Sequence, residues 1–236
     1  MDLSVETLRS NLELAGELIG KALGSTGEQD RKVRIMAVTK THPPGVAAMA
    51  IEAGVTLIGE NRVSEGGRKV RALGPESAEF HMIGPIHTGE VRQAVRDFQW
   101  IDSVDRLKIA REIARRTVDR GEDQPGLLLE VNTSGETSKH GFEPDIALLE
   151  DTMGKMDDLG LTVSGFLTVG PLGATEERTR DAFALLRRLR DGLQERCGLK
   201  LPELSMGMSD DFQLAVREGA TTVRLGRFLF GPRRVR

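Results

Sequence analysis

The chain has 236 residues, of which 39% are hydrophobic and 29% charged, and its net charge is −3. This composition is typical of a soluble globular protein and is too acidic overall for a general binder of nucleic acid. The chain contains no tyrosine. A reaction that needs the protein's own phenol as acid, base or nucleophile is therefore excluded.

The arginine clusters and the cysteine count limit the class of protein further. The arginine-rich stretches Arg111–Arg120 and Arg187–Arg190 alternate with apolar residues at helical spacing, which indicates solvated helix faces; a third cluster is Arg233–Arg236. Cys197 is the single cysteine, so no internal disulfide can form.

The N-terminus lacks the basic start and apolar run of a signal peptide, and no apolar stretch approaches the roughly 18 residues of a membrane span. We expect a cytoplasmic protein without a nucleic-acid or membrane partner.

The apolar pattern predicts one N-terminal helix followed by eight strands that alternate with helices. The first helix is capped by Ser4 and carries an apolar stripe of Leu8, Leu12, Leu14, Ile19 and Leu23. The strands are expected at residues 33–38, 55–58, 79–83, 100–103, 127–131, 163–169, 203–206 and 221–225. The helices between them are expected at residues 45–53, 63–72, 89–97, 105–119, 144–159 and 175–196, with a last one opened by Asp210 and Asp211.

Regular alternation of strands and helices predicts a parallel sheet covered by helices. Eight such units in about 200 residues favour a closed (β/α)₈ barrel, here as a single domain over residues 1–236 with an extra N-terminal helix. An open doubly wound sheet is the alternative, but the dinucleotide-binding fingerprint is missing. Gly226–Gly231 is spaced like part of a phosphate-binding P-loop, yet Pro232 and Arg233 follow where that motif has Lys-Ser/Thr.

The active site of such a barrel is built at the carboxyl ends of its strands. Lys40 follows the first strand directly, and apolar walls there would favour the neutral amine, a nucleophile able to form a Schiff base. A surface lysine with its ammonium in water is the plainer interpretation of this residue alone.

The loops after the seventh and eighth strands form the second candidate feature, because barrels often bind phosphate there. Ser209 offers a hydroxyl, or serves as an ordinary helix cap, and Gly226 allows close approach of a ligand to the backbone. Arg224 points either into the barrel mouth or outward, and an inward arginine needs an acceptor. An amine, a phosphate-binding loop and a fixed cation together describe a site for pyridoxal 5′-phosphate.

Several segments appear in a specific order: residues 37–41 (AVTKT), 59–63 (GENRV), 81–84 (HMIG), 204–211 (LSMGMSDD) and 223–231 (VRLGRFLFG). This set spans nearly the whole chain and resembles the pyridoxal phosphate homeostasis protein family. The resemblance implies the barrel domain of bacterial alanine racemases, standing alone. It implies Lys40 as the Schiff-base lysine and Ser209, with the backbone of Gly226 and Arg227, as the phosphate site. It also implies Arg224 opposite the pyridine nitrogen and Asn61 along the face of the cofactor.

Two segments depart from the family pattern. The family usually has Leu-Gln-x-Asn-Lys after His-x-Ile-Gly, where this chain has residues 86–90 (IHTGE), and Arg227 replaces a residue that is typically small. The four histidines show no metal-ligand spacing, so no metal site is expected.

Three functions are compatible with these residues. A carrier would hold pyridoxal phosphate on Lys40 and deliver it to recipients such as enzymes that lack the cofactor. An amino-acid racemase would use the same lysine as a base. A Schiff-base aldolase would use the lysine without a cofactor. The racemases resembled here take their second base, a tyrosine, from a partner subunit, and this chain has none to give. We therefore favour the carrier without a reaction of its own, and we expect a monomer.

Overall fold

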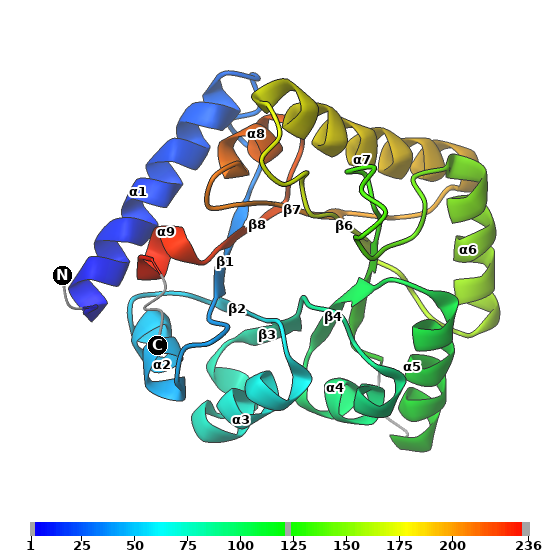
Figure 1. Cartoon of the computed structure of the whole chain (residues 1–236), viewed down its shortest axis with the longest axis horizontal. Helices are drawn as coiled ribbons and strands as arrows, with labels where there is room; N and C mark the ends of the chain where they lie inside the picture. The colour runs from blue at the N-terminus through cyan, green and yellow to red at the C-terminus, as the bar shows by residue number, and fades with distance from the viewer. Residues whose placement is uncertain (1–2, 121–123, 233–236) are drawn as a thin grey trace.

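The computed structural model describes residues 3–120 and 124–232 and contains a closed barrel of parallel strands in the order β1 to β8, with β8 pairing back onto β1. Figure 1 looks into this barrel, with the helices as an outer ring. The predicted (β/α)₈ architecture with an extra N-terminal helix is confirmed. The strands are β1 (Arg34–Val38), β2 (Leu57–Glu60), β3 (Glu79–Met82), β4 (Trp100–Val104), β5 (Gly126–Glu130), β6 (Gly165–Leu167), β7 (Glu203–Met208) and β8 (Thr222–Leu225).

The helices cover the outside of the barrel. They are α1 (Val5–Gly24), α2 (Pro44–Glu52), α3 (Val63–Leu73), α4 (Val91–Asp97), α5 (Leu107–Arg120), α6 (Ile146–Asp158), α7 (Glu176–Cys197), α8 (Phe212–Arg217) and α9 (Arg227–Phe230), with two short 3₁₀ turns, η1 (Pro75–Ser77) and η2 (Thr88–Glu90). The additional helix α1 packs across α8, α9 and α2, and so covers the seam where the barrel closes (Figure 1). In the part of the chain that the structure describes, no helix has the length and apolar character to cross a membrane.

Local sequence explains where the long helices begin. The Ser4 side chain accepts a hydrogen bond from the Thr7 N–H, as predicted, and Asp145 and Thr175 do the same for α6 and α7. Each cap satisfies N–H groups that have no carbonyl partner within the helix. The apolar faces of these helices then pack on outward-facing strand residues such as Ile58 and Phe80 in one continuous core.

Some sequence-based boundaries were wrong. Strand β6 covers only Gly165–Leu167 rather than residues 163–169, whereas β7 continues to Met208. The helix α9 was not predicted, because four residues are too few to show a helical period. Leu14, assigned to the apolar stripe of α1, is 46% exposed. The cluster Arg233–Arg236 lies outside the described residues.

The interior of the barrel is unusually polar. Arg34 on β1 forms ion pairs with Glu79 on β3 (3.1 Å) and Glu203 on β7 (3.2 Å). These strands are not neighbours in the barrel, so the pairs reach across its inside. Barrel interiors are more often filled by layers of branched apolar side chains. The charges inside this barrel therefore need an explanation beyond packing.

Candidate functional site

Strand register brings four of the predicted residues to one rim of the barrel. Val38 pairs with Gly59, so Lys40 and Asn61 each follow a paired residue by two positions on adjacent strands. Ala37 pairs with Leu225, which places Gly226 beside the end of β1. Arg224 pairs with Met208, the residue before Ser209. The carboxyl ends of β7, β8, β1 and β2 thus form one continuous arc, and both Lys40 and Asn61 are half-buried on it.

The backbone next to Lys40 is strained. Thr41 has φ +69°, and it is the sole non-glycine residue with positive φ among residues 3–120 and 124–232. Such a conformation costs a β-branched residue on the order of 1–3 kcal/mol and persists only where surrounding contacts hold it. The Thr41 N–H donates to Glu65 Oε1 at 2.6 Å, which is one such contact.

Ser209 connects the loop after β7 to the start of α9. Its hydroxyl accepts a hydrogen bond from the Phe228 N–H at 3.1 Å. The interpretation of Ser209 as a cap of the following helix was wrong, because Asp211 occupies the N-cap position of α8. Just before this loop, the end of β7 needs Gly207, with φ +88°, because an added Cβ would lie 2.5 Å from Ala215 Cβ. Gly207 thus lets the end of β7 lie close to α8, and Ser209 connects the loop after β7 to the start of α9.

The first residues of α9 present main-chain donors at this rim. Gly226 is the N-cap, and Arg227 is the first helical residue, whose N–H has no carbonyl partner within its own helix. An added Cβ at Gly226 would come no closer than 3.6 Å to Val38 O, so this glycine is not required by crowding within the chain. The Arg227 side chain is exposed and forms an ion pair with Asp210.

Arg224 points into the barrel, which decides between its two predicted orientations. It is 4% exposed, and its guanidinium donates to Ser205 O (2.6 Å), Ser205 Oγ (2.9 Å) and Thr168 O (2.7 Å). These three bonds leave two of the five N–H groups of a guanidinium for other partners. The acceptors that an inward arginine needs are thus supplied, in part, by the chain itself.

Carboxylates surround this buried cation. Burial lowers the pKa of Arg224, and the charges of Asp102, Asp211 and Glu130 oppose that effect. Burial raises the pKa of Asp211 and of Glu130, which the nearby arginine counteracts. Beneath the rim, three carboxylates therefore share one buried arginine as a counter-charge.

His81 extends the charged interior away from Arg224. Its Nδ1 lies 2.9 Å from Asp102 Oδ1, its Nε2 lies 2.8 Å from Glu79 Oε1, and its ring stacks on Trp100 at 5.3 Å. Burial disfavours the charged imidazole, but the two carboxylates outweigh it and raise the pKa of His81 to about 9. The side chain is therefore an imidazolium at neutral pH.

Sequence reasoning missed the interior residues Glu79, Asp102 and Glu130. It also missed a buried ion cluster beside Lys40, formed by Glu60, Glu65 and Lys69. The Lys69 Nζ lies 2.6 Å from Glu60 Oε1 and 3.0 Å from Glu65 Oε1. The available signal was the spacing of Glu65 and Lys69, which suits an i,i+4 pair on a helix, but such pairs are usually exposed. Here the Lys69 side chain is 1% exposed.

The divergent segment 86–90 ends in the turn η2, which covers Thr88–Glu90. The His87 N–H donates to Glu90 Oε2 at 3.1 Å, so this histidine and glutamate cap a turn. The residues that the structure describes contain no group of three or more His, Cys, Asp or Glu that could hold a metal ion.

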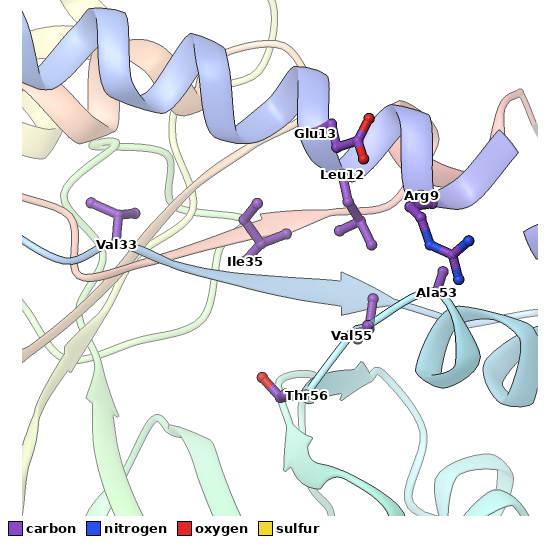
Figure 2. A pocket seen from close by; sticks show the side chains of 9 residues that line it. Arg9, Leu12, Glu13, Val33, Ile35, Ala53, Val55 and Thr56 are labelled. Atoms are coloured by element: carbon purple, nitrogen blue, oxygen red, sulfur yellow. The ribbon is translucent and has the colours of Figure 1, made fainter. Parts of the chain in front are cut away.

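Cavities elsewhere on the surface do not include these residues. One lies between α1, the start of β1 and the segment that joins α2 to β2, with Arg9, Glu13, Ile35 and Thr56 among its lining residues (Figure 2). Another lies between α7 and the loops after β5 and β6, with Ser134, Arg178 and Arg188 in its wall. Neither contains a residue of the arc around Lys40.

Comparison with known proteins first defines the class. The sequence model of the family "Alanine racemase, N-terminal domain" matches residues 21–234 of this chain. The pyridoxal phosphate homeostasis protein of Aquifex aeolicus is 38% identical over 220 residues, which are 92% of this chain and 95% of that protein. The chain belongs to the pyridoxal phosphate homeostasis protein family, as its motifs suggested.

Solved structures agree with this assignment. A protein of Bifidobacterium adolescentis has a TM-score of 0.87 at 34% identity and covers 96% of this chain and 95% of its own. PipY of Synechococcus elongatus, solved with pyridoxal phosphate bound, has a TM-score of 0.77 at 35% identity; the match covers 90% of this chain and 100% of PipY.

Proposed function

We propose that this protein binds pyridoxal 5′-phosphate at the arc formed by β7, β8, β1 and β2, and that it holds and delivers the cofactor without catalysing a reaction on a substrate. The family and the PipY structure with bound cofactor support binding. The observation that carries the proposal is the strand register that gathers an amine, a hydroxyl and main-chain N–H groups on one rim. We further propose a cytoplasmic, monomeric, single-domain protein.

The donor set fits this cofactor. Lys40 supplies the amine that holds the aldehyde carbon as a Schiff base. Ser209 and the N–H groups of Gly226 and Arg227 supply neutral donors for the phosphate at a helix start. Arg224 offers its remaining N–H groups toward the pyridine nitrogen, and Asn61 lines the ring face. A cofactor with both an aldehyde and a phosphate uses both sides of this arc.

The buried guanidinium argues against carbanion chemistry. Bound pyridoxal phosphate supplies an electron sink for negative charge at a substrate α-carbon, and that sink is strongest when the ring nitrogen is protonated. Arg224 is a permanent cation, so it disfavours a second positive charge on the nitrogen beside it. The chain also has no tyrosine to act as the second base of a racemase. These residues retain the cofactor more readily than they use it.

Titration with pyridoxal phosphate tests binding, with the visible absorption band of the Schiff base as readout. We expect Lys40→Ala to abolish the absorption band. The matched control is Lys200→Ala, because Lys200 is exposed and precedes β7, at the opposite end of the barrel. If Lys40→Ala gives the same spectrum and affinity as the unaltered protein, the covalent assignment is wrong.

Proton exchange separates a carrier from an enzyme. The loaded protein is incubated in D₂O with individual L-amino acids, and loss of the α-proton is followed by NMR. We expect no exchange above that of free pyridoxal phosphate. Exchange that depends on Lys40 and turns over repeatedly would establish a racemase-like enzyme instead.

A further inference from the structure

The ion cluster of Glu60, Glu65 and Lys69 lies beside Lys40 and has no part in the cofactor contacts proposed above. Lys69 projects from α3 and is 1% exposed. Its three N–H groups are all used, since Nζ donates to Thr39 O at 2.7 Å, Glu60 Oε1 at 2.6 Å and Glu65 Oε1 at 3.0 Å. An ammonium so fully bonded is held in one position.

The cluster holds the main chain on both sides of Lys40. On the preceding side, Thr39 accepts from Lys69 through its carbonyl and donates to Glu60 Oε1 through its hydroxyl. On the following side, the Thr41 N–H donates to Glu65 Oε1 at 2.6 Å. Glu65 is thus the acceptor that joins Lys69 to the strained residue. The Lys40 side chain leaves the backbone between two anchored neighbours.

The cluster is poorly explained as a device for stability alone. Glu60 is fully buried, and its Oε2 has no hydrogen-bond partner in the described structure. Buried ion pairs cost much of what they contribute, and an unsatisfied buried oxygen adds to that cost. Thr41 adds the strain of a positive φ. These energetically unfavourable features lie on both sides of Lys40, and such features are typical of a functional site.

We propose that Glu60, Glu65 and Lys69 are positioning residues that fix the backbone of Lys40, so that its amine points at the cofactor's aldehyde carbon. This inference rests on the proposed function. When the bond forms, the neutral amine nitrogen replaces the aldehyde oxygen, which leaves as water with the two amine protons. Fixing the amine beforehand removes the need to order it during that step.

The first test uses Glu65, because Lys69→Met would leave the buried Glu60 unpaired and confuse misfolding with mispositioning. Glu65→Met removes the acceptor at similar side-chain size, and Glu65→Gln keeps an acceptor oxygen. We expect Glu65→Met to slow formation of the borohydride-reducible adduct roughly tenfold, and Glu65→Gln to restore most of the rate. Glu112→Met is the matched control, since Glu112 also pairs at i,i+4 and is, like Glu65, 15% exposed.

The second measurement needs no cofactor. Amide hydrogen exchange of Thr41 in the unloaded protein should accelerate in Glu65→Met and stay unchanged in Glu112→Met. An unchanged adduct rate in Glu65→Met would overturn the positioning role, whether or not the exchange of Thr41 accelerates. If the unaltered protein forms no adduct, the proposed function fails, while the exchange result still decides whether the cluster holds Thr41.

A double-mutant cycle separates positioning from general weakening. Glycine adopts positive φ without strain, so Thr41→Gly should reduce the dependence on Glu65. We expect the tenfold effect of Glu65→Met to shrink to about twofold in the Thr41→Gly background. Equal effects of Glu65→Met in both backgrounds would contradict a role through the strained residue.

Discussion

The inside of the barrel and the layer between strands and helices differ sharply, and two neighbouring residues of β3 illustrate the difference. Phe80 faces outward and is fully buried in the apolar core beneath the helices. His81 faces inward and is held by Asp102 and Glu79. Both are less than 2% exposed, so burial alone does not distinguish them. The partners do.

This difference separates stability from function. The outer layer buries apolar side chains, and each large one contributes roughly 1.5–3 kcal/mol relative to exposure. The interior instead places Arg34, His81 and Arg224 among carboxylates, an arrangement that contributes little net stability. What the interior provides is a cation of fixed position beneath the rim. The two layers should therefore respond differently to substitution and to pH.

Removing the interior cation should have the largest effect. Arg224→Leu leaves Asp102, Asp211 and Glu130 without their shared counter-charge, and we expect a loss of about 3–5 kcal/mol in the free energy of urea unfolding. Arg227→Ala is the matched control three residues away. Its exposed pair with Asp210 should contribute less than about 1 kcal/mol. Equal losses in the two variants would show that the interior charges are not coupled.

The pH dependence of stability should come from the interior. The pKa of His81 rises from 6.5 to about 9 on folding, so its stabilising contribution is complete below pH 6.5 and is lost as the pH rises through about 9. We expect the stability difference between the unaltered protein and His81→Gln to shrink over this range, by on the order of a few kcal/mol.

Phe80→Leu is the outer-layer control for that experiment. Its destabilisation, about 1 kcal/mol, should be the same at both ends of the pH range. A pH-independent effect of His81→Gln would mean that the imidazolium pairs with Asp102 and Glu79 no better when folded than when unfolded.

The smallest expected effect concerns the rim, where main-chain groups dominate. Ser209→Ala removes one hydroxyl but leaves the N–H groups of Gly226 and Arg227, so affinity for pyridoxal phosphate should fall roughly five- to tenfold. Pyridoxal, which lacks the phosphate, should bind both proteins equally. A matching loss for pyridoxal would place Ser209 away from the phosphate.

The outer layer could be predicted from sequence and the interior could not. Apolar runs such as residues 33–38 indicated the strands. Capping residues and glycines marked the helices between them, and so gave the order of strands and helices along the chain. Charged residues within or beside those runs, such as Glu79 and Asp102, look in sequence like solvent-facing positions. Only closure of the barrel turns them inward, because partners such as Arg34 and Glu203 lie far away in the chain.

The candidate site was predictable where a short motif carries it. Lys40, Ser209 and Gly226 lie at strand ends, which glycine and proline residues nearby in the sequence indicate. Lys69 could not be recognised, because a lysine among Arg68 and Arg71 on a helix suggests a solvated face. Its burial depends on Thr39, thirty residues earlier. The hydrogen bond of Ser209 could not be predicted for a similar reason, since its partner Phe228 lies in α9, a helix too short to show in the sequence.

We propose above that the rim presents Lys40 as the covalent anchor of pyridoxal phosphate. Reduction of the loaded protein with borohydride, followed by peptide mass spectrometry, tests it most directly. We predict a single labelled peptide containing Lys40, with no label in Lys40→Ala. A label on any other lysine, or a bound cofactor that borohydride does not fix, would show that Lys40 is not the covalent anchor.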